Sequence, residues 1–279
     1  MNNRFSQLLV LITAFVFTIS CSKDDDDNPV SPLAEVITGA VTMIKADSAL
    51  FTGAISSEGQ TAVIKRGFCW ATHPDPTVSD NFSVNAFGSG NFTHTATGLD
   101  SNTIYFVKAY ATNGNGTAYG SVTAFKTKFQ IGEAGPAGGY VFYLDGSGGG
   151  LEAAPESTEG VADWGCVTTS IPGTLTDIGT GQANTTIIVN ACPVNNAAAF
   201  MSNDLVHNGY TDWYLPSKDE LHLMYTNLAA NGLGNFSFDR YWSSSEASAT
   251  SAWREDMSLG IQAGNSKFNP YRVRAIRSF

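Results

Sequence analysis

The chain has 279 residues, a formal net charge of −10 and 43% hydrophobic residues, enough apolar material for globular domains of ordinary size. Its charge is uneven, because residues 28–128 hold six Lys or Arg and six Asp or Glu, whereas residues 129–279 hold seven and fifteen. This acidic distal half argues against nucleic acid and anionic membrane surfaces as partners, since both favour clustered cations.

The N-terminal segment, residues 1–20, has the pattern of a secretory signal peptide. Arg4 precedes an apolar run from Leu8 to Ile19, and small Ser20 comes directly before Cys21. The run is well short of the roughly 20 residues that a membrane-spanning helix needs. A short buried helix is the alternative interpretation. The junction resembles the lipobox of lipoprotein signal peptidase, with Thr18 where Leu is usual, and this implies cleavage and lipid attachment at Cys21.

Residues 21–33 form a predicted tether. Four adjacent carboxylates, Asp24 to Asp27, repel one another and cannot be buried together. A solvated linker is the plain interpretation. Residues 21–27, Cys-Ser-Lys-Asp-Asp-Asp-Asp, also resemble the export signal that sends some lipoproteins to the outer leaflet. The resemblance implies an outer-membrane protein that is anchored in lipid through Cys21 and faces the cell exterior.

Three cysteines remain if Cys21 carries lipid, and an exported protein meets an oxidising compartment. Cys166 and Cys192 fall in the same predicted domain, separated by a loop rich in Gly, Thr and Asn, so we predict that they form a disulfide. Cys69 is predicted to be a buried thiol on a strand. The chain has no Cys-x-x-Cys, and its histidines lack ligand spacing with the cysteines, so we expect no metal site and no cofactor.

Residues 34–128 predict an all-β immunoglobulin-like sandwich. Short stretches rich in Val, Ile, Thr, Phe and Tyr alternate with Gly, Asn, Asp and Pro, a rhythm typical of antiparallel sandwiches. Seven strands are expected, near residues 35–44, 48–56, 62–72, 82–87, 92–98, 103–113 and 117–127. In the sixth strand, one set of alternate residues is expected to face the opposite sheet: Tyr105, Val107, Ala109 and Ala111.

Three motifs in this region resemble the fibronectin type III family: Gly-Leu-Asp-Ser-Asn-Thr-Ile-Tyr at 98–105, Lys-Ala-Tyr-Ala-Thr-Asn at 108–113 and Gly-Phe-Cys-Trp at 67–70. In that family, Leu and Tyr six residues apart form a tyrosine corner, here Leu99 and Tyr105. Ser101 stands where the family usually has Pro. The resemblance implies a spacer or a protein-binding module, and we assign no site to this domain.

Residues 129–279 predict an α+β domain. An early strand at Tyr140–Leu144 precedes a glycine-rich loop that is expected to be a hairpin turn. Helices are expected over residues 196–207 and after Ser217, which forms a capping box with Glu220. Late strands are expected at 240–245, 251–258, 260–264 and 271–279, and the first and last strands of the domain are expected to pair.

Five motifs of this domain resemble the Lcl C-terminal domain family and the related major paralogous domain: residues 164–166, 178–185, 209–221, 241–246 and 273–277. The family is placed with C-type-lectin-like and formylglycine-generating-enzyme-like folds, and its members include surface adhesins that bind glycans. The chain lacks the Glu-Pro-Asn and Trp-Asn-Asp motifs of calcium-dependent lectins, and no cysteine follows Cys192 for oxidase chemistry. Calcium binding is left open.

Most motif residues are expected to be structural. Trp213 and Trp242 are predicted to fill the core and Asp212 to cap a turn. Asp219 and Glu220 resemble a catalytic acid pair, but their place in the first turn of a helix explains both through the helix dipole.

The candidate ligand-binding residues are Trp253, Arg254, Glu246 and Asn265, which we expect in or beside the late loops. An aromatic ring with amide, carboxylate and guanidinium groups suits a sugar, whose apolar face stacks and whose hydroxyls need donors and acceptors.

The sequence thus predicts a tethered, non-enzymatic surface lipoprotein in which a sandwich spacer presents a C-type-lectin-like module for adhesion or glycan binding. Two other classes stay open: a structural module of a cell-surface assembly, and a hydrolase acting on polysaccharide. The hydrolase motifs Gly-x-Ser-x-Gly and His-Glu-x-x-His are missing.

Overall fold

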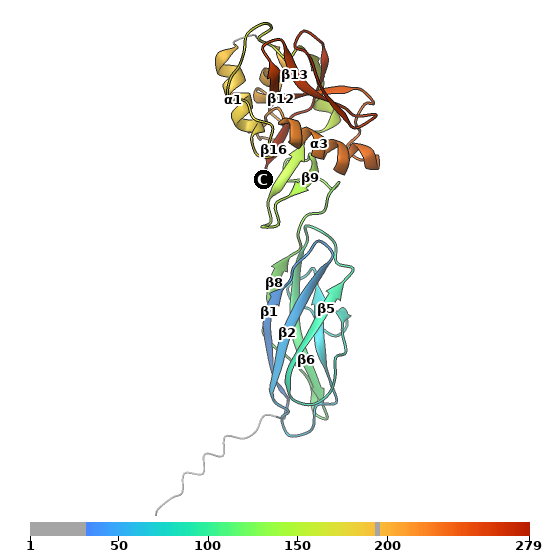
Figure 1. Cartoon of the computed structure of the whole chain (residues 1–279). Helices are drawn as coiled ribbons and strands as arrows, with labels where there is room; N and C mark the ends of the chain where they lie inside the picture. The colour runs from blue at the N-terminus through green and yellow to red at the C-terminus, as the bar shows by residue number, and fades with distance from the viewer. Residues whose placement is uncertain (1–31, 193–195) are drawn as a thin grey trace, which may run out of the picture.

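The computed structural model describes residues 32–192 and 196–279 (Figure 1). The predicted signal peptide, the lipidation site Cys21 and the acidic run lie outside the described residues. Within these two ranges, no helix combines the length and apolar character needed to cross a membrane. The chain forms a sandwich domain followed by a mixed domain.

The proximal domain consists of two antiparallel sheets with the orders β1-β2-β5 and β4-β3-β6-β7, and β8 also pairs with β6. The strands are β1 (Glu35–Thr42), β2 (Ser48–Ser57), β3 (Lys65–Ala71), β4 (Asn81–Phe82), β5 (Gly90–Thr97), β6 (Ile104–Asn113), β7 (Gly116–Tyr119) and β8 (Thr123–Lys126). The predicted fourth strand is reduced to β4, and the predicted seventh is divided into β7 and β8. The predicted all-β sandwich is confirmed.

The two sheets enclose an aromatic core. The Phe51 ring lies 5.6 Å from the Trp70 ring and 5.5 Å from the Phe125 ring. The predicted inward-facing set of β6 is buried. The tyrosine corner forms as expected, because the backbone N–H of Asp100 donates to the Tyr105 hydroxyl at 3.0 Å. Cys69 is a fully buried thiol on β3, and burial raises its pKa to about 11, so it stays protonated at neutral pH.

The distal domain contains a three-stranded sheet, β16-β10-β9, and a five-stranded sheet, β11-β15-β12-β13-β14. Their strands are β9 (Tyr140–Leu144), β10 (Gly150–Ala153), β11 (Gly160–Ala162), β12 (Arg240–Ser248), β13 (Ser251–Asp256), β14 (Ile261–Ser266), β15 (Tyr271–Val273) and β16 (Ile276–Ser278). We predicted that the first and last strands of this domain pair with each other, but β9 and β16 are not neighbours. Instead, β10 lies between β9 and β16 and pairs with both, because the glycine-rich loop folds back as a β9–β10 hairpin.

Helices cover the five-stranded sheet on both faces. They are α1 (Gly181–Ala191), α2 (Ala198–Asn203) and α3 (Lys218–Asn227), with single turns η1 (Glu156–Thr158) and η2 (Ala229–Asn231). The first two helices pack with Trp242 and Ala252 on one face, whereas α3 packs with Tyr241 on the other. Figure 1 shows α1 and α3 on different sides of the strands β12 and β13.

Two helix predictions need correction. The segment between the disulfide cysteines contains α1, where we expected a loop, and α2 is half the length of the predicted helix over 196–207. The buried face of α1 carries Asn184 and Thr185 as well as Ile188, so it has little apolar periodicity. The capping box of α3 is confirmed: Ser217 Oγ accepts from the Glu220 N–H, and the Glu220 carboxylate accepts from the Ser217 N–H.

Candidate functional site

The four predicted ligand-binding residues, which we expected in or beside the late loops, all lie on strands. Glu246 is on β12, Trp253 and Arg254 are neighbours on β13, and Asn265 is on β14. Successive residues of a strand point to opposite faces of the sheet. Trp253 therefore faces the α3 side, while Arg254, paired with Trp242 across the strands, faces the α1 side. The four residues do not form a single site.

Glu246 is part of an internal ion pair. Its carboxylate accepts from the Lys267 ammonium at 2.5 Å and from the Ile171 N–H at 2.8 Å. Lys267 is fully buried, and it also donates to the Thr169 carbonyl at 2.9 Å. A buried charge requires such partners, because its desolvation is otherwise costly. Glu246 thus fastens the loop near residue 170 to the sheet.

Arg254 and Asn265 do meet, but they bind each other. The Arg254 Nε–H donates to Asn265 Oδ1 at 2.9 Å, and its Nη1 donates to the Ile261 carbonyl at 3.0 Å. The guanidinium also lies 3.7 Å from the Asp256 carboxylate. These internal contacts leave Arg254 little capacity to bind a ligand.

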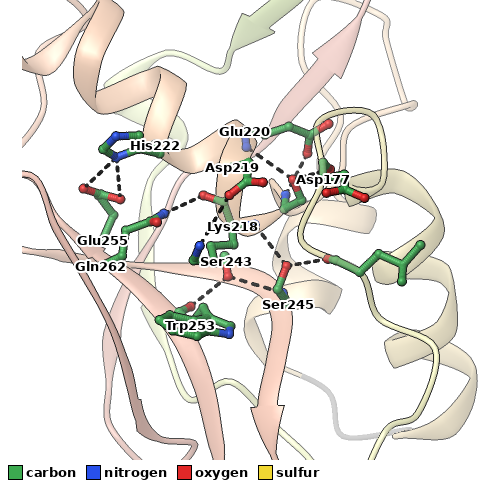
Figure 2. A network of polar contacts seen from close by, with 12 residues as sticks. Asp177, Lys218, Asp219, Glu220, His222, Ser243, Ser245, Trp253, Glu255 and Gln262 are labelled. Atoms are coloured by element: carbon green, nitrogen blue, oxygen red, sulfur yellow. Dashed lines mark hydrogen bonds and ion pairs between the residues drawn. The ribbon is translucent and has the colours of Figure 1, made fainter.

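Trp253 is the residue around which a ligand site is best built. Its half-buried ring lies on the α3 side of the sheet, and the Lys218 ammonium is 4.9 Å from the ring centroid. The Lys218 ammonium is also 3.5 Å from the Asp219 carboxylate. Gln262 of β14 lies beside these groups, as Figure 2 shows. We call Trp253, Lys218, Asp219 and Gln262 the Trp253 surface.

Backbone hydrogen bonds fix the beginning of α3 against the sheet in this region (Figure 2). The Lys218 N–H donates to the Ser245 hydroxyl at 3.0 Å, and Gln262 Nε2 donates to the Lys218 carbonyl at 2.8 Å. From the sheet side, the Ser243 hydroxyl donates to the Trp253 carbonyl at 2.8 Å. The main chain on both sides of the Trp253 surface is therefore held by short hydrogen bonds, whereas the Lys218 ammonium makes the longer contacts with Trp253 and Asp219.

A histidine–carboxylate pair lies one turn along α3. His222 Nδ1 is 3.3 Å from both carboxylate oxygens of Glu255, which is fully buried on β13. Burial raises the pKa of Glu255, and the neighbouring His222 opposes that effect. Since Trp253 and Glu255 are two residues apart on one strand, they face the same side of the sheet. The pair thus fastens α3 to β13 next to the Trp253 surface.

The apparent acid pair, Asp219 and Glu220, is divided between two environments. Glu220 is buried, accepts from the N–H groups of Gly179 and Ser217 at 2.8 and 2.7 Å, and completes the capping box. Burial raises its pKa. Asp219 is partly exposed. The helix-start interpretation accounts for both residues without catalysis. Among the described residues, no group of three or more His, Cys, Asp or Glu side chains is placed to hold a metal ion.

The remaining motif residues hold the domain together. Trp213 and Trp242 are buried, as predicted. The carboxylate of Asp212, which we predicted to cap a turn, receives two hydrogen bonds from the Arg277 guanidinium, at 2.8 and 2.9 Å. This pairing holds the pKa of Asp212 below its usual range.

The predicted disulfide between Cys166 and Cys192 is present, with a Cα–Cα distance of 5.5 Å. It joins the end of α1 to the segment before it; Cys192 is buried in the core that contains Trp164, and the partly buried Cys166 packs against that core.

Sequence reasoning identified Trp253 but missed Lys218 and Gln262. The position of Lys218 at the start of a capped helix was visible in the sequence, yet no local signal placed that helix over β13. The arrangement brings together an aromatic face, an ammonium, a carboxylate and an amide, which are groups that bind polar ligands with an apolar face.

No protein-family model and no curated protein match the chain. Among solved structures, it is similar to the sensor domain of the anti-sigma factor RsgI4 of Pseudobacteroides cellulosolvens, with 22% identity and a TM-score of 0.27; the match covers 35% of this chain and 96% of that one. It is also similar to a fibronectin type III domain of human collagen XX, with 15% identity and a TM-score of 0.27, over 35% and 95% of the two chains. These similarities are weak, and the sandwich is defined by its own strand order and core.

Proposed function

We propose that the chain is a lipoprotein anchored in the outer membrane through Cys21, and that it carries a non-enzymatic glycan-binding module of the C-type-lectin-like type. The sandwich acts as a spacer, and its lipid anchor and acidic tether place the distal domain outside the cell. The observation that carries the binding proposal is the Trp253 surface, where a half-buried indole ring lies among charged and amide groups.

A saccharide fits this chemistry. One face of a sugar ring is apolar and stacks on an indole, while its hydroxyls need both donors and acceptors at the edge. Asp219 supplies acceptors and Lys218 supplies donors to an uncharged sugar, while the Gln262 amide holds the Lys218 carbonyl. The capping box and the Ser245 contact preorganise the main chain of the site, which lowers the entropy lost on binding.

A glycan array probed with the purified protein, with and without calcium, tests the proposal. Trp253→Ala should weaken binding by about 1 kcal/mol, roughly fivefold, with nearly unchanged thermal unfolding. Trp242→Ala is the matched control for structural damage, because its ring is fully buried and donates to the Ala162 carbonyl at 3.1 Å. That change should cost roughly 3 to 5 kcal/mol of stability. Wild-type binding by Trp253→Ala would refute the site.

A structural role in a cell-surface assembly is the second candidate. It is favoured by the internal use of three predicted ligand residues, since Glu246, Arg254 and Asn265 are all bonded within the domain. Under this alternative, no glycan binds, and Trp253→Ala instead weakens association with a protein partner.

The anchor has its own test. Cys21→Ser should leave the precursor without lipid and remove it from the outer-membrane fraction. Incorporation of labelled palmitate into this variant would contradict the anchor. Replacing Asp24 to Asp27 with Ala should protect the protein from protease added to whole cells, and unchanged digestion would argue against the export signal.

A further inference from the structure

The Trp253 surface contains a small cation-binding arrangement that the chain fills with its own lysine. The Lys218 ammonium lies 4.9 Å from the Trp253 ring centroid and 3.5 Å from the Asp219 carboxylate. An indole face and a carboxylate together attract an ammonium, the ring through its quadrupole and the carboxylate through its charge.

The Lys218 side chain is held loosely compared with the other lysine of the distal domain. Lys267 is fully buried and contacts Glu246 at 2.5 Å and a carbonyl at 2.9 Å. The Lys218 side chain is partly exposed, and its ion pair with Asp219 is long at 3.5 Å. A partly exposed ion pair of this length contributes little to stability. Since Ser245 and Gln262 hold the backbone of Lys218, its side chain can leave the ring without disturbing α3.

The charge of the domain also favours a positive ligand. Residues 129–279 contain seven Lys or Arg and fifteen Asp or Glu, a net charge of −8. A field of this sign attracts cations and repels acidic saccharides at moderate ionic strength. A second exposed carboxylate belongs to Asp177, whose backbone carbonyl accepts from the Ser217 hydroxyl at 2.9 Å. It adds to the negative potential at this end of α3.

We propose that the Trp253 surface recognises saccharides that carry a protonated amino group, with the ligand's ammonium replacing that of Lys218 between the Trp253 ring and the Asp219 carboxylate. The inference rests on the proposed glycan-binding function and specifies its ligand class. In the free protein, Lys218 competes for the same position and so lowers the affinity for the ligand.

Binding of three soluble probes tests the inference: glucosamine oligomers, N-acetylglucosamine oligomers of equal length and oligogalacturonate. We expect the full protein to prefer the amine, then the acetylated oligomer, and to bind the acid least. Lys218→Met removes the internal competitor, so it should tighten glucosamine binding by about two- to fivefold, the size of an exposed cation–π contact. Lys45→Met, which changes the same charge at an exposed position of the sandwich, should have no effect.

Salt provides a further readout on the wild-type protein, so the inference can fail even if Lys218→Met does not fold. Glucosamine affinity should fall as salt rises, while affinity for the uncharged oligomer should change little. Equal or weaker binding of the amine, or weaker amine binding by folded Lys218→Met, would overturn the inference. If the acetylated oligomer binds through Trp253 and the amine does not, the ligand class is wrong and glycan binding stands. If no saccharide binds, both proposals fail.

Discussion

Arg274 offers the sharpest test of how the distal domain is held together. Its side chain is fully buried, and its Nε–H donates to Glu159 at 2.6 Å. The two other nitrogens donate to the carbonyls of Ala154 at 2.7 Å and Gly234 at 3.0 Å. Arg274→Met keeps most of the side-chain volume but removes the charge and every donor.

The expected cost follows from these contacts. Removing one member of a buried ion pair typically costs about 3 to 5 kcal/mol, because the other charge stays desolvated. Glu159 keeps the Tyr241 hydroxyl at 2.8 Å and Arg272 at 3.2 Å, which offsets part of that cost. The two carbonyls that lose their donor add roughly 1 kcal/mol or more each. We therefore expect Arg274→Met to lower the free energy of unfolding by about 4 kcal/mol.

Arg240→Met is the matched control. It makes the same substitution in the same domain, but the Arg240 side chain is 48% exposed, and its ion pair with Asp256 is 3.7 Å long. Its loss should be at most about 1 kcal/mol. Urea unfolding followed by tryptophan fluorescence reports on this domain, because four of the five tryptophans lie in residues 129–279. Equal losses in the two variants would refute this account of the buried network.

Three further predictions concern other parts of the structure. Cys192→Ser, which opens the link to Cys166 over a sequence separation of 26, should destabilise the distal domain by roughly 3 kcal/mol in urea unfolding and leave the sandwich transition unchanged. Tyr105→Phe should cost the sandwich about 1 kcal/mol, since the Asp100 N–H loses its acceptor, and an unchanged midpoint would show that water replaces the hydroxyl. Because Arg277 lowers the pKa of Asp212, this pair stabilises the folded state fully above the ordinary carboxyl pKa of about 4, and the stabilisation is lost as pH falls through the lowered pKa. Asp212→Asn should therefore flatten this part of the dependence of thermal unfolding on pH, measured between pH 2 and 7. Identical profiles for the variant and the wild type would contradict the assignment.

The sandwich was the more predictable half of the chain. Its strands alternate apolar and polar residues, so Tyr105 and Val107 could be assigned to the core from periodicity alone. The turn signals marked the ends of the strands within a few residues. The predicted strand over 82–87 is reduced to Asn81–Phe82, although the chain stays hydrogen-bonded to β3 as far as Ala86, which forms an isolated bridge with Arg66.

Helix α1 could not be predicted because its buried face is partly polar. Asn184 exchanges hydrogen bonds with the backbone of Leu175 at 2.7 and 2.8 Å, and the Thr185 hydroxyl accepts from the Leu215 N–H at 3.0 Å. These side chains bind loops that come from elsewhere in the chain. Periodicity detects apolar faces, and a face that is buried through specific hydrogen bonds has no such signal.

The sequence predicted one residue of the candidate site, Trp253, but not the packing that surrounds it with Lys218 and Gln262. Trp253 and Arg254 were grouped because both were expected in or beside the late loops, yet neighbouring residues of a strand point to opposite faces of the sheet. Lys218 reaches Trp253 from a helix that precedes β13 by more than twenty residues. Lys218 and Trp253 meet only because α3 packs on the sheet, and no local sequence pattern predicts that packing.

The buried ion pairs determine where the net negative charge of the distal domain is located. Lys267, Arg274 and Arg277 are largely buried, and each is matched by a buried or nearly buried carboxylate from Glu246, Glu159 or Glu152. Each of these pairs is electrically neutral, so the three pairs contribute nothing to the net charge of −8. That charge belongs to the remaining charged side chains, most of which lie at the surface. The cations that would otherwise screen the surface carboxylates are used inside the domain. The partly exposed ammonium of Lys218 therefore lies in a negative field, and a ligand that brings its own positive charge gains from the same field.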